Sequence, residues 1–220
     1  VFTGIWFQTL TGSGIRGVGE LPDVEVNKHS GTLTLASIIN TKNDWSHIEG
    51  VVAYGSSELA FTGSSQYFNN AGMSVNSLYI DVTGGLYITG NLNVMGELYV
   101  KNWTVLGGDL YAYGDVTTAL TSQSTTTGIV HFVGSNAQTF SGAGVNGFFT
   151  EVSVEKTATS TLTIADDIRV RGDITVTTGL LSAGTSTITL VGTGSTIQSN
   201  GQSLYNLTLD TPGAITISGT

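Results

Sequence analysis

Residues 84–119 read GGLYIT-GNLNVM-GELYVK-NWTVLG-GDLYAY-GDVTTA, a run of six-residue units. Each unit opens with a glycine or, once, an asparagine, at Gly84, Gly90, Gly96, Asn102, Gly108 and Gly114. Apolar residues prevail two and four places later, as at Leu92 and Val94, which is the alternation of a β-strand with one buried face. The opening glycine fits a turn that requires a positive φ. Short strands separated by regular turns favour a β-solenoid, a coil of stacked strands.

We therefore expect an all-β protein folded as a single β-solenoid (β-helix) over residues 1–220. Three units would make one turn of the coil, here called a rung, so that a rung should take about 18–20 residues. A row of small β-sandwich domains is the rival architecture, since its strands are also regularly spaced. The strict six-residue period argues against this rival, because sandwich hairpins rarely hold one period over such a length.

A longer repeat overlies the short one. Similar phrases begin at Phe2-Thr3-Gly4, Phe61-Thr62-Gly63, Phe132-Val133-Gly134 and Leu190-Val191-Gly192, and a glutamine follows each of them. The degenerate copies cover residues 1–59, 60–130, 131–188 and 189–220, the last being incomplete. We expect the residues in excess of whole rungs to form loops at the corners, in a Ser/Thr-rich run at 117–127 and in the irregular segment 39–57.

Composition excludes several classes of protein. Charged residues make up 10% of the chain, against about 25% in an average soluble protein. The formal net charge of −9 disfavours nucleic acid, whose phosphates it would repel. The absence of cysteine excludes disulfides and thiolate metal sites, and no apolar run reaches the ~18 residues of a membrane span. The chain begins at Val1, which predicts a processed protein or part of a longer polypeptide.

Several phrases resemble those of repetitive bacterial and archaeal surface proteins with β-solenoid shafts. Residues 204–209, LYNLTL, resemble an L-x-N-L-T-L phrase that follows F-x-G, and residues 90–94, GNLNV, resemble a G-D-L-x-V-x phrase. The resemblance extends over essentially the whole chain and implies a secreted shaft of an adhesin or filament. Phage tail-fibre shafts and the cytoskeletal bactofilins carry similar phrases, so these motifs specify an architecture and not an activity.

Arg171-Gly172-Asp173 spells the tripeptide of integrin ligands. The same slot is filled elsewhere by Gly108-Asp109-Leu110 and Gly114-Asp115-Val116. We therefore interpret Gly172 as a structural turn residue and Asp173 as a polar corner.

The remaining chemical candidates are scattered. Glu97 and Asp115 should lie in one column on neighbouring rungs, about 4.8 Å apart, where paired carboxylates could bind calcium or act as acid and base. Tyr87, Tyr99 and Tyr111 should point outward, but their spacing predicts separate surface residues and no sugar-binding ladder. The histidines His29, His47 and His131 lack ligand spacing, and Asp166-Asp167 reads as a second acidic corner. We expect no catalytic residues, no cofactor and no metal site, and hence no enzyme.

Two functional classes remain open. The first is a structural component of an extracellular filament or cell-surface appendage, in which strand edges at the ends of the rod pair with another copy or another surface protein. The candidate assembly residues are Val1 and Phe2 at one end and Ala214, Ile215 and Ile217 at the other. The alternatives are a carbohydrate-binding or polysaccharide-degrading β-helix, which would take a glycan, and a phage tail-fibre shaft, which would be a trimer.

Overall fold

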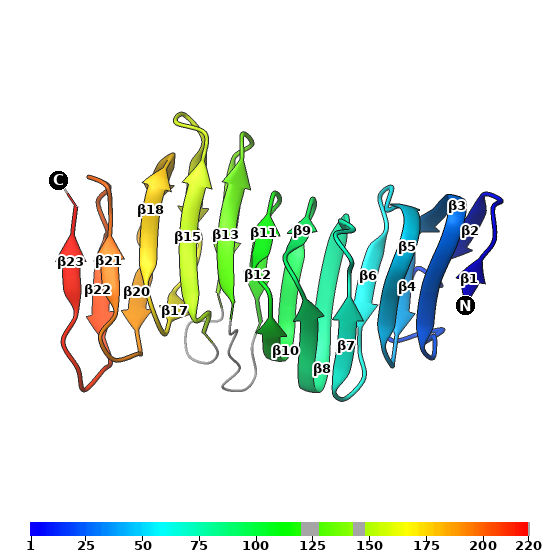
Figure 1. Ribbon diagram of the computed structural model, residues 1–220. Helices are drawn as coiled ribbons and strands as arrows, with labels where there is room; N and C mark the ends of the chain where they lie inside the picture. The colour runs from blue at the N-terminus through cyan, green and yellow to red at the C-terminus, as the bar shows by residue number, and fades with distance from the viewer. Residues whose placement is uncertain (120–127, 143–147, 220) are drawn as a thin grey trace.

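The computed structural model describes residues 1–119, 128–142 and 148–219, without the side chains of 103–106. The chain coils into a rod of about 10 turns, with its two termini at opposite ends (Figure 1). Every regular element in the described ranges is a β-strand, and the strands pair in parallel. The predicted all-β solenoid is confirmed.

The strands form three sheets. The first contains β1 (Phe2–Thr3), β2 (Gln8–Thr11), β3 (Val24–Ala36), β4 (Ile38–Thr41), β5 (Trp45–Ala53), β6 (Glu58–Phe61), β7 (Gln66–Asn69), β8 (Ser77–Thr89), β10 (Leu98–Gly107), β12 (Val116–Thr118), β14 (Gln138–Ser141), β16 (Thr161–Ile164) and β19 (Leu180–Ser182). The second contains β9 (Leu92–Val94), β11 (Leu110–Ala112), β13 (Ile129–Gly134), β15 (Glu151–Lys156), β18 (Ile174–Thr178), β21 (Thr196–Gln198) and β23 (Thr216–Ser218). The third contains β17 (Ile168–Val170), β20 (Thr187–Leu190) and β22 (Asn206–Leu209).

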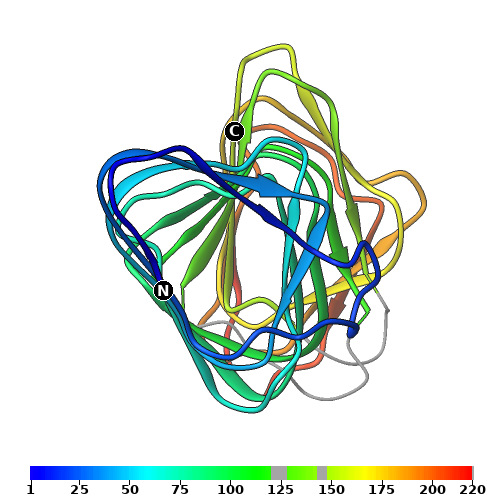
Figure 2. The same ribbon diagram turned by 90° about the vertical axis from the view of Figure 1, so that its right-hand side faces the viewer.

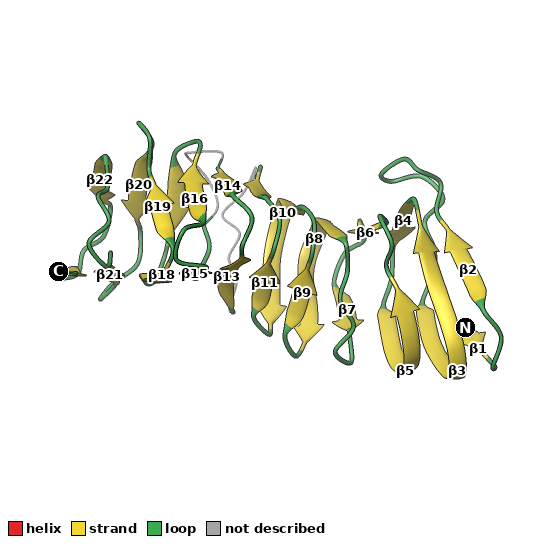
Figure 3. Cartoon of the chain, turned by 90° about the horizontal axis from the view of Figure 1, so that it is seen from above, coloured by secondary structure: helices red, strands yellow, loops and turns green. Residues whose placement is uncertain are grey.

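Seen along its axis, the rod has a roughly triangular outline (Figure 2). Apolar side chains fill its interior. The interior is one continuous hydrophobic cluster that extends from β3 to β21. Strands of successive rungs lie side by side along the rod (Figure 3), in a sheet that extends from β1 to β19 and another that extends from β9 to β23. The period-2 pattern explains this arrangement, since alternate residues such as Leu92 and Val94 are fully buried while Asn93 between them is half-buried.

The length of a rung varies along the rod. Leu92 pairs with Leu110, the equivalent residue three units later, as the six-residue period predicts. Val116 pairs with Phe140, and the rung between these two residues is longer. The predicted rung length therefore holds in the most regular segment and is exceeded elsewhere, because additional residues lie at the corners between strands. The part of the predicted Ser/Thr loop at 120–127 lies outside the described residues.

Two local predictions were wrong. Segment 39–57 is not a loop, because most of it belongs to β4 and β5, and its Trp45 is completely buried. The six-residue period places Thr104 three units after Leu86, so these two residues should pair. In the unit that opens with asparagine the register shifts twice along β10, and Val105 pairs with Leu86 instead. A bulge of this kind changes which residue occupies a given position by one, and the six-residue period cannot reveal it.

The glycines that open the units are required for a different reason from the one predicted. Of the six opening residues, Gly90 alone has a positive φ, of 76°. A β-carbon at Gly108 would lie 1.8 Å from the carbonyl oxygen of Gly90, and one at Gly114 would lie 2.3 Å from that of Gly96. Gly172 is similar, with 2.4 Å to the carbonyl oxygen of Thr150. These glycines let neighbouring rungs approach closely at the corners.

Candidate functional site

The corner aspartates have a shared structural role. Each accepts a hydrogen bond from a backbone N–H of the next rung. The bonds join Asp44 Oδ1 to Tyr67 N (2.8 Å), Asp109 Oδ1 to Ile129 N (2.9 Å), Asp115 Oδ1 to Thr139 N (2.7 Å), Asp167 Oδ1 to Thr187 N (2.7 Å) and Asp173 Oδ1 to Thr196 N (2.7 Å). Each bond satisfies a donor at a strand start, as a side-chain cap does for a helix. The aspartate of the G-D-L phrase therefore helps to hold successive rungs together.

The Arg171-Gly172-Asp173 tripeptide follows the same rule. Asp173 is only half-exposed and its Oδ1 is used by Thr196 N, while the guanidinium of Arg171 lies 5.6 Å from the ring centre of Phe148. Both charged side chains thus have partners within the rod, as the structural interpretation of the tripeptide implies.

We expect Asp173→Ala to lower the free energy of unfolding by about 1–2 kcal/mol, because a charge-assisted hydrogen bond is lost and Thr196 N is left unpaired. Asp173→Asn keeps a carbonyl acceptor and should lose less than half as much. Urea-induced unfolding of the two variants beside the wild type measures both effects. Equal stability of all three proteins would contradict the capping role.

Glu97 and Asp115 lie on neighbouring rungs, as predicted, since Leu98 pairs with Val116. They line a lateral groove of about 540 Å³ together with Thr117, Thr139 and Ser141. Both carboxylates already accept hydrogen bonds, Glu97 Oε1 from Thr117 Oγ1 at 3.3 Å and Asp115 from Thr139 N. Carboxylates and hydroxyls therefore line the groove, and both carboxylates are hydrogen-bonded to residues of the neighbouring rung.

The three tyrosines singled out in the sequence do not stack on one another, as their spacing predicted. Each instead contacts an aromatic residue of an adjacent rung, with stacked rings for Tyr87 and Tyr111 and tilted rings for Tyr99. Ring centres lie 4.9 Å apart for Tyr67 and Tyr87, 5.4 Å for Tyr79 and Tyr99, and 4.3 Å for Tyr111 and His131. Sequence reasoning missed these pairs because the offset between their members is not a multiple of the six-residue period.

His131 on β13 is the centre of a polar cluster that spans three rungs. Its Nδ1 lies 2.7 Å from Glu155 Oε1, and its Nε2 lies 3.6 Å from Asp109 Oδ2. Ser153 donates a hydrogen bond to the same Oε1 at 2.7 Å. Burial would raise the pKa of Glu155, but the hydrogen bonds from Ser153 and His131 outweigh it and hold this pKa below its usual value.

Two lysines are buried inside the rod. Lys28 Nζ donates to Trp6 O (2.7 Å) and Gln8 Oε1 (2.9 Å), and Lys156 Nζ donates to Gln138 Oε1 (2.5 Å). Burial lowers the pKa of Lys156. Gln8 and Gln138, two of the glutamines in the longer repeat, thus accept hydrogen bonds from buried lysines. A signal for the lysines was present in the sequence, since each occupies the inward position after two valines, in VEVNK and VSVEK.

A loop near the first rung is fastened to the side of the rod. Arg16 makes a bidentate ion pair with Glu58, with Nε–Oε1 and Nη2–Oε2 distances of 2.7 and 2.6 Å. Its guanidinium lies 4.2 Å from the ring centre of Tyr79. The side chain therefore links residues that are far apart in the sequence, and no sequence pattern indicated this contact.

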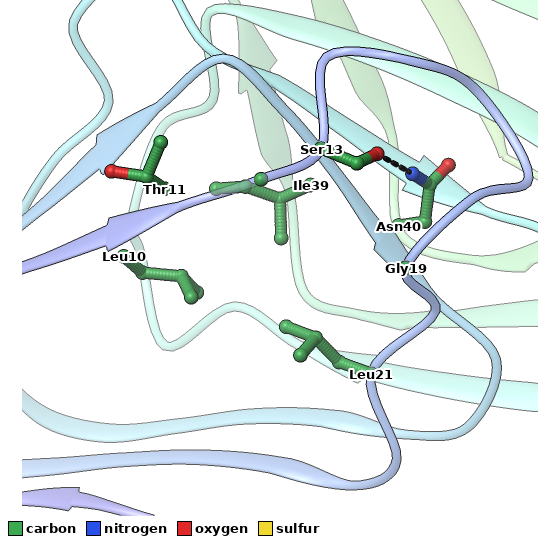
Figure 4. Close-up of a pocket in the computed structure, with 8 residues that line it drawn as sticks. Leu10, Thr11, Ser13, Gly19, Leu21, Ile39 and Asn40 are labelled. Carbon is green, nitrogen blue, oxygen red and sulfur yellow. Dashed lines mark hydrogen bonds between the residues drawn. The ribbon is translucent and has the colours of Figure 1, made fainter.

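Beneath the same loop lies a cavity of about 240 Å³ (Figure 4). Its floor is apolar, from Leu10, Leu21 and Ile39, and Asn40 forms its polar wall. Asn40 Nδ2 donates to the carbonyl oxygens of Ile15 (2.8 Å) and Val18 (2.7 Å), and its Oδ1 accepts from Gly17 N (2.7 Å). The polar atoms of Asn40 thus fix the loop and are not free for a ligand.

The candidate assembly residues lie at the two ends of the rod. Phe2, in β1, pairs with Val26, and Ile217, in β23, pairs with Ile197. Val26 and Ile197 are completely buried, whereas Ile217 is 62% exposed and Val1 is 79% exposed. Among the described residues, Ile217 on β23 and Val1 beside β1 therefore expose apolar surface at the two ends of the rod, whereas Phe2 is half-buried against the core.

The described ranges contain no group of three or more histidine, aspartate or glutamate side chains that could hold a metal ion. No helix in this part of the chain has the length and apolar character to cross a membrane. Comparison of the chain with protein-family models, curated proteins and solved structures finds no match.

Proposed function

We propose that this chain is a structural component of an extracellular filament or cell-surface appendage, in which it forms a rigid shaft. The observation that supports this function best is the parallel pairing of successive rungs, in overlapping sheets that extend from β1 to β23 around a single core. In such a rod each rung is hydrogen-bonded to the rungs on both sides, so stiffness is built into the backbone. The low charge suits an exposed extracellular polymer, and the absence of cysteine leaves no thiol to be oxidised there.

The partner we propose is a second copy of the chain, bound end to end. Exposed strand edges readily accept further strands, and Ile217 at one end offers apolar surface for such a contact. β1 and β23 belong to different sheets, but the chain coils in one direction throughout. A rotation about the rod axis therefore brings the outer edge of β1 in one copy parallel to the outer edge of β23 in another. Because these two edges lie at opposite ends of the rod and face along its axis, the contact repeats along that axis and produces an open filament.

We expect the purified protein to form filaments whose length grows with concentration, with a meridional spacing of about 4.8 Å. Ile217→Asp places a charge in this contact and should abolish filaments. Thr216→Asp adds the same charge on the same strand, at the alternate position, and should retain them. Electron microscopy, fibre diffraction and sedimentation velocity together measure these outcomes.

Wild-type protein that remains monomeric at every concentration would overturn end-to-end assembly. A trimeric mass without filaments would favour the interwound phage-fibre shaft instead. If Ile217→Asp forms filaments as well as the wild type does, the contact between copies does not involve this end of the rod. That result would contradict the proposed contact.

A further inference from the structure

His47 on β5 is buried between two acceptors. Its Nδ1 lies 2.9 Å from the carbonyl oxygen of Asn70, and its Nε2 lies 3.0 Å from the carbonyl oxygen of Gly50. A carbonyl oxygen can only accept a hydrogen bond, whereas a neutral imidazole carries a proton on one nitrogen and a lone pair on the other. The neutral ring would therefore hold a lone pair against an oxygen. Only the doubly protonated ring satisfies both contacts.

His131 repeats this arrangement at a distant rung. Its two nitrogens face Glu155 Oε1 and Asp109 Oδ2, and ionised carboxylates also only accept. Nε2 is buried and makes no hydrogen bond at its 3.6 Å separation from Asp109. The ring lies flat on Tyr111, with an interplanar angle of 2°, so it cannot turn either nitrogen toward water without losing this stacking.

We propose that His47 and His131 are proton-dependent clasps between neighbouring rungs, in which both ring nitrogens have a favourable partner only in the imidazolium form. His47 then ties β5 to the turn after β7, through Asn70. His131 ties the corner before β11 to β15 through Asp109 and Glu155. Histidine is the side chain whose charge ordinarily changes between about pH 5 and 8. The rod is thus built to tighten as its surroundings become mildly acidic and to loosen at these corners as they become alkaline.

Other ionisable residues lie on the strands around each ring. The strands at His47 carry Glu25, Lys28 and His29 on β3, Glu49 on β5 itself and Tyr67 on β7. The strands at His131 carry Tyr111 on β11, with Asp109 and Tyr113 beside it, and Glu151, Glu155 and Lys156 on β15. Carboxylates outnumber amines in both sets, and each amine is held at its own site, Lys28 by Trp6 O and Gln8, and Lys156 by Gln138.

The protonation state is measured directly by long-range ¹H–¹⁵N correlation on protein labelled with ¹⁵N-histidine. At about pH 6 both nitrogens of His47 and of His131 should carry protons. His29 is the internal control, because its side chain is 87% exposed. A single proton on either ring at this pH would overturn the proposal for that ring. This measurement uses the wild-type protein and does not depend on filament formation.

The effect of the two histidines on the stability of the rod is measured by thermal unfolding. The midpoint should rise by about 2–4 °C for each clasp between about pH 8.5 and 6. His47→Gln and His131→Gln should each remove their share of this rise, and His29→Gln, the matched control, should keep all of it. The pH range ends above about pH 5, because the stability contributed by the lowered pKa of Glu155 is lost as that carboxylate protonates. A midpoint that is equal at both pH values would contradict the proposal.

Discussion

Gly108→Ala should lower the free energy of unfolding by about 3 kcal/mol or more, although the backbone at this position is ordinary. The new methyl group would lie 1.8 Å from the carbonyl oxygen of Gly90, and that oxygen belongs to the backbone of the preceding rung. Neither partner can rotate away, so two rungs must separate. Overpacking of a rigid site usually costs about 1–3 kcal/mol, and a clash with backbone lies at the upper end.

Gly90→Ala is the matched control for this prediction. Gly90 has a φ of 76°, and no atom lies within 4 Å of the place that a β-carbon would take. Alanine in the left-handed region costs about 1–2 kcal/mol, and a gain of about 0.4–1 kcal/mol from a less flexible unfolded chain offsets part of it. Urea unfolding of both variants compares the two causes. A larger loss for Gly90→Ala would mean that turn conformation, and not close approach, selects glycine at the corners.

The sequence was sufficient to predict the fold because the alternation of apolar residues is a local property. Leu86, Leu98 and Leu110 were assigned to the interior by counting, and all three are at most 1% exposed. The role of the opening glycines was predicted wrongly, because the close approach of two backbones depends on the neighbouring rung. A single unit specifies only its own turn, and the stacking distance between two units is a tertiary property.

Contacts between rungs were also beyond sequence reasoning. His131 contacts Tyr111 on one neighbouring rung and Glu155 on the other. The sequence separation is larger for Glu155 than for Tyr111. Rung lengths vary because corners differ, so no fixed period brings these side chains together in advance. The buried Lys156 is the exception, since its position in the alternation places it inside; the expectation that a charge stays outside concealed it.

Phe140→Ala should be among the most destabilising single substitutions in the interior. Phe140 is 1% exposed and lies between Phe132 and Phe149, with ring centres 5.2 and 5.4 Å away. Truncation of a buried phenylalanine costs about 3–5 kcal/mol through lost burial and the cavity left behind. Because each rung is stabilised by its neighbours, hydrogen exchange should quicken in β13 and β16 as well as in β14.

Two further variants separate burial from aromatic stacking as the cause. Phe140→Leu keeps most of the volume and loses only the ring contacts, so it should cost about 1–1.5 kcal/mol. Tyr67→Ala removes a ring that stacks on Tyr87 at 4.9 Å but is 56% exposed, and it should cost less than about 1.5 kcal/mol. If Tyr67→Ala were as costly as Phe140→Ala, stacking along the rod axis would contribute more than the core. The smaller loss expected here follows from burial, which removes apolar surface from water only in the interior.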